Sequence, residues 1–88
     1  MSQSIGSPAV DVGVIREVIA QHARLGRDLV DADDVLDLYS VGLTSLATVG
    51  VMLALEDRFD LEFPESMLGR DTFRSIANIQ EAIQSLLA

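Results

Sequence analysis

The sequence contains no cysteine and no lysine, and only 5% of its residues are aromatic. Without cysteine the chain has no disulfide framework, no thiolate ligands for a metal and no cysteine nucleophile. Any thiol in its chemistry would therefore have to be brought in by a cofactor. Because aromatic residues are scarce while 49% of the residues are hydrophobic, we expect a core made mostly of aliphatic side chains.

Positive charge is also scarce. The chain has six basic residues, all of them arginine, against 14 acidic residues, and its net charge is −8. Nucleic-acid binding requires a basic face for the phosphates, so this composition argues against a nucleic-acid partner. An acidic surface would instead speed association with basic partners, although it would equally serve solubility alone.

Long apolar runs are absent as well. No run approaches the length of a membrane span, and residues 1–7 have neither the basic nor the apolar region of a signal peptide. We therefore expect a cytoplasmic protein with no membrane attachment. With 88 residues the chain should form one domain. In it, residues 1–8 are expected to be a disordered N-terminal tail and residues 9–88 to fold.

Three stretches repeat apolar residues at the spacing of one helix face, which predicts three main helices over about residues 9–24, 45–58 and 75–87. Gly26 is the expected C-cap of the first helix. Pro64 can open a short fourth helix over 65–68. The sequence therefore predicts an all-α fold, a small four-helix bundle of three main helices and one short helix.

Residues 27–44 lack a sustained period and are rich in aspartate. A loop of this length is usually functional or held by its own apolar contacts, so we expect Leu36 or Leu38, together with Leu43, to reach the core. The aspartates do not fit a calcium loop, because counting from Asp31 puts leucine where an EF-hand needs Gly and glycine where it needs Glu. A solvated acidic loop is expected instead. Its acidic residues are Asp28, Asp31, Asp33, Asp34 and Asp37.

The helix expected over 45–58 has two apolar stripes, although a chain of this size has few elements with which to bury both. The stripe that ends on Phe59 should face the core, and the stripe that starts at Leu46 should be partly exposed and mark a contact surface. The alternative is that both stripes belong to the core. The first stripe consists of Thr48, Val51, Met52, Leu55 and Phe59, and the second of Leu46, Val49, Gly50 and Leu53.

Ser45 stands where this helix starts, three residues after Gly42, which permits a tight turn. Thr44 or Ser45 is suited to cap the helix, and the backbone N–H groups at its start favour a phosphate. A serine at a helix start is most often only a cap, but this one adjoins the exposed stripe and leads to an acidic helix end.

The segments around this serine resemble the acyl carrier protein family, and the pattern is most similar to its stand-alone aminoacyl carrier proteins. Thr44 is a departure, because many members have Asp before the serine. The resembling segments are DL at 37–38, GLTSL at 42–46, LEDRF at 55–59 and FP at 63–64.

In that family the matching serine carries a 4′-phosphopantetheine arm, whose terminal thiol holds an acyl or aminoacyl group as a thioester. The resemblance covers about residues 10–87 and implies that Ser45 carries the cofactor within a carrier domain at 9–88. It implies three partners for a monomeric carrier: a phosphopantetheinyl transferase, a ligase that charges the arm and a downstream acceptor or transferase. The ligase would be related to aminoacyl-tRNA synthetases, and the cargo would be an acyl group or a small amino acid.

The exposed stripe and the acidic end of the same helix are the expected docking surface for these partners. The stripe would offer an apolar contact beside Ser45, and the acids would meet basic residues of an approaching enzyme. The expected docking residues are Leu46, Val49, Leu53, Glu56, Asp57 and Asp60.

Catalysis by the chain itself has little support. Serine catalysis needs a nearby base, and the only histidine, His22, falls on the apolar face of the first helix, where a packed or half-buried structural role is expected. The residues around Ser45 do not form a G-x-S-x-G elbow. We therefore predict a protein that is not an enzyme. The alternative to a carrier is an acidic helical adaptor, whose exposed stripe binds a partner helix and which needs no serine.

Overall fold

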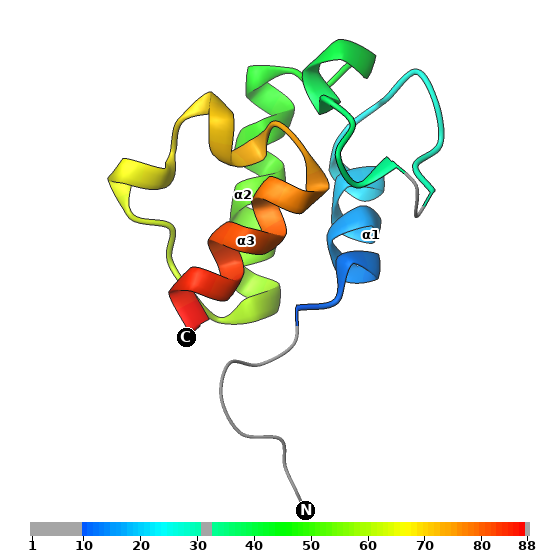
Figure 1. Cartoon of the computed structure of the whole chain (residues 1–88). Helices are drawn as coiled ribbons and strands as arrows, with labels where there is room; N and C mark the ends of the chain where they lie inside the picture. The colour runs from blue at the N-terminus through cyan, green and yellow to red at the C-terminus, as the bar shows by residue number, and fades with distance from the viewer. Residues whose placement is uncertain (1–9, 31–32, 88) are drawn as a thin grey trace, which may run out of the picture.

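The computed structural model describes residues 10–30 and 33–87. The tail expected at residues 1–8 lies outside the described residues. Within them the chain forms three α-helices and three short 3₁₀ helices and no β-strand (Figure 1), which confirms the prediction of a small all-α bundle. In chain order the elements are α1 (Val12–His22), η2 (Leu38–Val41), α2 (Ser45–Phe59), η3 (Glu65–Met67), η4 (Arg70–Phe73) and α3 (Ile76–Leu87).

Helix α1 packs against both α2 and α3. It begins after Asp11, whose carboxylate accepts a hydrogen bond from the Gly13 N–H at 2.8 Å. It ends at His22, and Ala23 in extended conformation is its C-cap. The predicted C-cap at Gly26 was therefore wrong: Gly26 lies beyond the helix, and its N–H donates to the Val41 carbonyl at 2.7 Å.

The connection between α1 and α2 is held by ion pairs, so the prediction of a solvated acidic loop was wrong for part of it. Asp33 is only 8% exposed and accepts two hydrogen bonds from the Arg27 guanidinium, at 2.8 and 2.9 Å. Asp34 pairs with Arg16 on α1 at 2.6 Å. Each pair balances the charge of an aspartate, since buried charge is tolerated when it is paired. The Asp34–Arg16 pair also ties this part of the connection to α1.

The apolar anchors expected in this connection are confirmed. Leu38, the first residue of η2, is fully buried, and Leu43 is 5% exposed, whereas Leu36 is half-buried. The Leu38 N–H also donates to the Arg74 carbonyl at 2.7 Å, which ties η2 to the chain just before α3. Residues 38–44 therefore reach the start of α2 along a fixed path.

Helix α2 follows the predicted limits to within one residue and has the two predicted faces. Val51 and Leu55 are buried, and Thr48, Met52 and Phe59 on the same stripe are half-buried. On the second stripe Leu46, Val49 and Leu53 are exposed, at 85%, 49% and 55%, and Gly50 is half-buried. The alternative in which both stripes are core is therefore wrong.

The chain from α2 to α3 closes the remaining side of the core. The predicted short helix is η3, with Pro64 as its N-cap, and η4 adds a second turn. Phe63 and Phe73 pack edge to face, with ring centroids 5.4 Å apart. Ser75 caps α3, since its Oγ accepts from the Asn78 N–H at 3.1 Å. Apart from these two rings the buried hydrophobic residues are aliphatic, as expected.

Candidate functional site

Ser45 is the first residue of α2, and its neighbour Thr44 caps the helix. The Thr44 Oγ1 accepts a hydrogen bond from the Ala47 N–H at 3.0 Å, and the Thr44 carbonyl accepts from the Thr48 hydroxyl at 2.8 Å. Ser45 is exposed, and its hydroxyl makes no hydrogen bond to any residue that the structure describes. The serine hydroxyl is therefore exposed and is not used in a capping bond, which Thr44 makes instead.

Gly42 sets the direction in which the chain enters α2. Its φ of +123° lies in a region that L-residues rarely adopt, and a Cβ on it would lie 3.1 Å from the Arg24 carbonyl oxygen. Its N–H closes η2 by donating to the Tyr39 carbonyl at 3.4 Å. The glycine thus permits the turn that buries Leu43 and leaves Ser45 at the surface.

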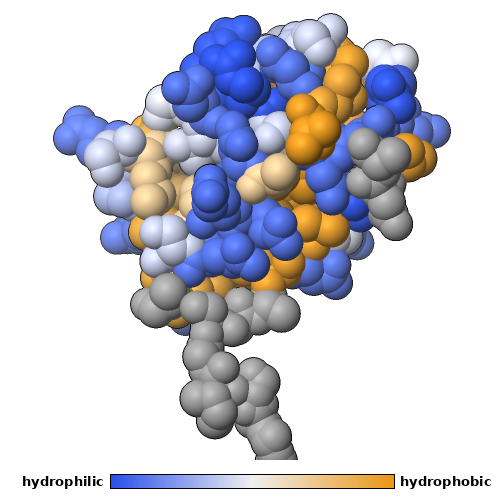
Figure 2. All heavy atoms as spheres, viewed as in Figure 1, coloured by the Kyte–Doolittle hydropathy of each residue, from blue (hydrophilic) through white to orange (hydrophobic). Residues whose placement is uncertain are grey.

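The predicted docking residues lie along α2 and at its C-terminal end, and they differ in how exposed they are. Asp57 and Asp60 are exposed, like the apolar stripe of Leu46, Val49 and Leu53. Glu56 is half-buried, and one of its carboxylate oxygens accepts from the Phe63 N–H at 2.9 Å. Glu56 therefore holds the chain after α2 in place. On the face drawn in Figure 2, apolar side chains reach the surface between polar ones.

A hollow of about 300 Å³ lies directly beside Ser45. Arg70 forms part of its wall, and the guanidinium carbon of Arg70 lies 3.9 Å from the centre of the Tyr39 ring, at stacking distance for a cation–π contact. Sequence reasoning missed both residues, because Arg70 is 25 positions from Ser45 and no spacing connects them. The hollow is lined by Tyr39, Ser45, Thr48, Val49, Leu68, Gly69 and Arg70.

His22 is not packed in the core, and the prediction of a packed or half-buried role was wrong. It is exposed in the last turn of α1 and faces Gly50 of α2. A Cβ atom added to Gly50 would lie 3.6 Å from the Nδ1 of His22. With Arg24 and Leu46, His22 lines a second hollow of about 410 Å³, which Ser45 does not line. The last turn of α1 extends past the buried residues of the helix, and the His22 side chain therefore reaches solvent.

Two further kinds of site are not found in the described part of the chain. Residues 10–30 and 33–87 contain no group of three or more His, Cys, Asp or Glu side chains that could hold a metal ion. None of the helices there is long and apolar enough to cross a membrane.

The cap gives a first testable prediction. Replacing Thr44 by alanine should lower the free energy of unfolding by about 0.5–2 kcal/mol, because the Ala47 N–H loses its acceptor. Replacing Thr44 by aspartate should retain most of the stability, since an Asp side chain can accept the same hydrogen bond. Urea denaturation followed by circular dichroism measures both. Equal losses for the two variants would show that the hydroxyl bond does not hold the helix start.

Comparison with known proteins agrees with this geometry. Residues 14–83 match the family model described as a phosphopantetheine attachment site. The chain is 40% identical over 73 residues to an aminoacyl carrier protein of Agrobacterium fabrum, covering 83% of this chain and 88% of that protein. It is 37% identical over 59 residues to a D-alanyl carrier protein of Streptococcus sanguinis, covering 64% of this chain and 75% of that one.

A solved structure shows the same fold. It is that of an engineered Bradyrhizobium japonicum glycine:[carrier protein] ligase complexed with a carrier protein from Agrobacterium tumefaciens and ATP. The match has a TM-score of 0.79 at 38% identity and covers 84% of this chain and 96% of that chain. Domains of this family carry 4′-phosphopantetheine covalently on a serine. The chain therefore belongs to the family of phosphopantetheine-type carrier proteins.

Proposed function

We propose that Ser45 carries the 4′-phosphopantetheine arm and that the loaded protein holds an acyl or aminoacyl group, in particular a small amino acid, as a thioester. The observation that supports this most is the exposed, unbonded hydroxyl of Ser45 at the start of α2, beside a threonine that supplies the cap. Among family members the modified residue is a serine. Ser45 also stands in the GLTSL segment through which the chain resembles that family.

The chain contributes binding and position, and the arm and the partner enzymes supply the chemistry. The modified side chain would lie at the start of α2, and a helix N-terminus favours the negative charge of a phosphodiester. The flexible arm then keeps its thioester at high effective concentration near each docked active site. Because the carrier must leave each partner, docking is weak and exchangeable.

The partners follow from this cycle. A phosphopantetheinyl transferase installs the arm, a ligase charges it, and a downstream acceptor or transferase removes the cargo. The solved relative bound to a glycine:[carrier protein] ligase supports an amino-acid ligase as the charging enzyme here. We propose that the protein meets each of them as a monomer.

The exposed stripe of α2 is the surface we propose for docking. Replacing Val49 by aspartate should weaken binding at any salt concentration, because it places a charge in the apolar contact. Replacing Asp57 by arginine should slow association, most clearly at low salt where screening is weakest. Binding kinetics against a charging ligase or a pantetheinyl transferase measure both effects.

The Val49 and Asp57 side chains are both exposed, so neither replacement should unfold the protein. Circular dichroism of each variant should match the wild type. The replacement of Glu81 by arginine reverses a charge on the exposed side of α3 and should leave the kinetics unchanged. If Val49→Asp and Asp57→Arg bind like the wild type while folded, docking occurs elsewhere, and the acidic connection before α2 is the next candidate.

The experiment that tests the function is loading. The purified protein is incubated with coenzyme A and a pantetheinyl transferase, and its intact mass is measured. A carrier gains the mass of one phosphopantetheine group, and the loaded form then gains an amino acid when a charging ligase and ATP are added. An acidic adaptor, the alternative function, would show no mass gain at all.

A further inference from the structure

The arginines of the chain differ in whether a carboxylate neutralises them. Four of the six form ion pairs: Arg16 with Asp34, Arg27 with Asp33, Arg58 with Glu17, and Arg74 with Asp71 and Asp37. Arg24 and Arg70 pair with no carboxylate among the described residues. Within residues 10–30 and 33–87, these two arginines are therefore not neutralised by a carboxylate, although the chain has a net charge of −8, and each lines a hollow next to the start of α2.

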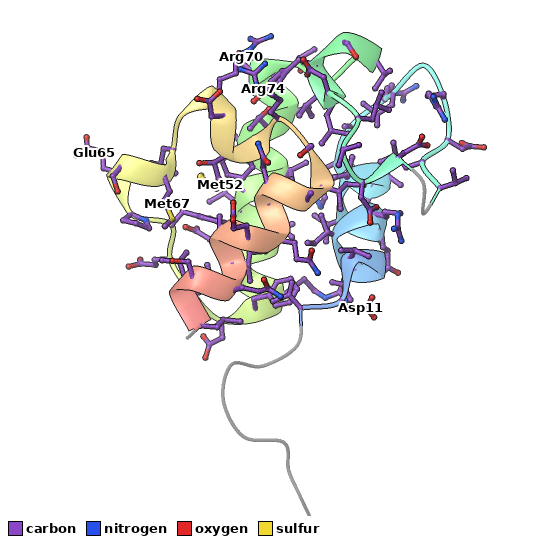
Figure 3. All side chains as sticks on the ribbon, in the orientation of Figure 1. Asp11, Met52, Glu65, Met67, Arg70 and Arg74 are labelled. Atoms are coloured by element: carbon purple, nitrogen blue, oxygen red, sulfur yellow. The ribbon has the colours of Figure 1, made fainter. Side chains whose placement is uncertain are left out.

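Arg70 is held in a defined place, although no carboxylate in the described part of the chain binds it. Its guanidinium stacks on the Tyr39 ring at 3.9 Å, and the backbone N–H of Tyr39 donates in turn to the Asp37 carboxylate at 2.9 Å. Four residues further on, Arg74 donates to Asp71 at 2.7 Å, which raises the pKa of the Arg74 guanidinium. Figure 3 shows Arg70 at the end of the molecule where α2 begins.

We propose that Arg70 binds the phosphodiester of the arm on Ser45 and, with the Tyr39 ring, directs the first part of the arm across the hollow they line. The inference rests on the proposed function of Ser45. A guanidinium presents a planar fork of N–H donors that suits phosphate oxygens. Its flat face can stay stacked on the aromatic ring while the N–H groups at its edge bind the phosphate.

The local charges support this role. The arm adds a negative charge to a protein that is already strongly acidic, and the neighbouring Thr44 and Thr48 hydroxyls are hydrogen-bonded within the helix start. Arg70 is the only cation among the residues that line the hollow beside Ser45. Its guanidinium is therefore the group that would compensate the new charge.

Arg24 provides a matched control. It is the other arginine without a carboxylate partner in the described residues, and it lines the hollow on the His22 side, which does not include Ser45. Replacing Arg24 or Arg70 by glutamine removes the same charge from an exposed residue. A general electrostatic effect would appear in both variants, whereas a direct contact would appear in only one.

The test compares the apo and loaded proteins by NMR after intact mass has shown loading. In the wild type, loading should shift the side-chain Nε–Hε signal of Arg70 and leave that of Arg24 in place. The ³¹P signal of the phosphodiester should move in loaded Arg70→Gln and stay at the wild-type position in loaded Arg24→Gln. Added NaCl should move the wild-type ³¹P signal towards that of Arg70→Gln, because salt screens the pair.

The possible failures are distinguishable. A protein that gains no mass overturns the proposed function of Ser45 and this inference with it. A protein that loads normally, but whose Arg70 signal does not move and whose ³¹P signal is the same in all three loaded forms, overturns the role of Arg70 alone. Equal ³¹P changes in Arg24→Gln and Arg70→Gln would also overturn it, because they would show an effect of net charge.

Discussion

Replacing Ser45 by alanine should abolish phosphopantetheine loading completely, while the wild type gains one group. In this modification the serine hydroxyl oxygen forms the bond to phosphorus, so a side chain without a hydroxyl at position 45 could not accept the phosphopantetheine group. The variant should still fold, because Thr44 supplies the cap and alanine is the best helix former. Intact mass after incubation with coenzyme A and transferase measures the result.

Two other serines, Ser40 and Ser75, serve for comparison because their hydroxyls are already bound. The Ser40 Oγ donates to the Asp37 carbonyl at 2.6 Å, and the Ser75 Oγ is buried and accepts from the Asn78 N–H. Ser40→Ala should load like the wild type. A mass gain in Ser45→Ala, or loss of loading in Ser40→Ala, would contradict the assignment of Ser45.

Replacing Leu55 by alanine should cost about 2–5 kcal/mol of unfolding free energy, because it leaves a cavity in the core. Leu55 is fully buried in α2, whereas Leu53, only two residues away, is 55% exposed. Leu53→Ala should therefore change stability by no more than about 0.5 kcal/mol, as surface substitutions usually do. The pair isolates the effect of orientation, since both variants lose the same atoms from the same helix.

Urea denaturation of the two variants tests whether α2 has one buried face and one exposed face. For Leu55→Ala the midpoint should fall well below the wild-type value, and the slope should stay unchanged if the denatured state is unaffected. Similar midpoints for the two variants would show that α2 does not present one face to the core and another to solvent.

The helices could be predicted from the sequence because their causes are local. Thr44 and Ser45 mark the start of α2 and Ser75 marks the start of α3, since capping needs only a side chain and the next turn of backbone. The two faces of α2 could also be predicted, because the only aromatic residue of the segment, Phe59, lies on the stripe that packs inward.

The features that could not be predicted depend on contacts between distant residues. Asp34 is neutralised by Arg16, 18 positions earlier, and no local pattern connects the two. The prediction that His22 is packed or half-buried was wrong, because periodicity shows which side of a helix faces inward but not how far the core extends along the helix. The Tyr39–Arg70 contact beside Ser45 likewise arises only when η2 and η4 come together.

The hydrogen bond of the Thr44 hydroxyl has a consequence for how enzymes recognise the state of the carrier. Because the hydrogen bonds that cap α2 are made by Thr44, attaching a group to the Ser45 oxygen would not require any of them to break. We therefore expect the backbone at the start of α2 to be the same in the empty, armed and charged forms of the proposed carrier. An enzyme that distinguishes these forms would then have to contact the arm and its cargo directly, because the helix itself would not differ between them.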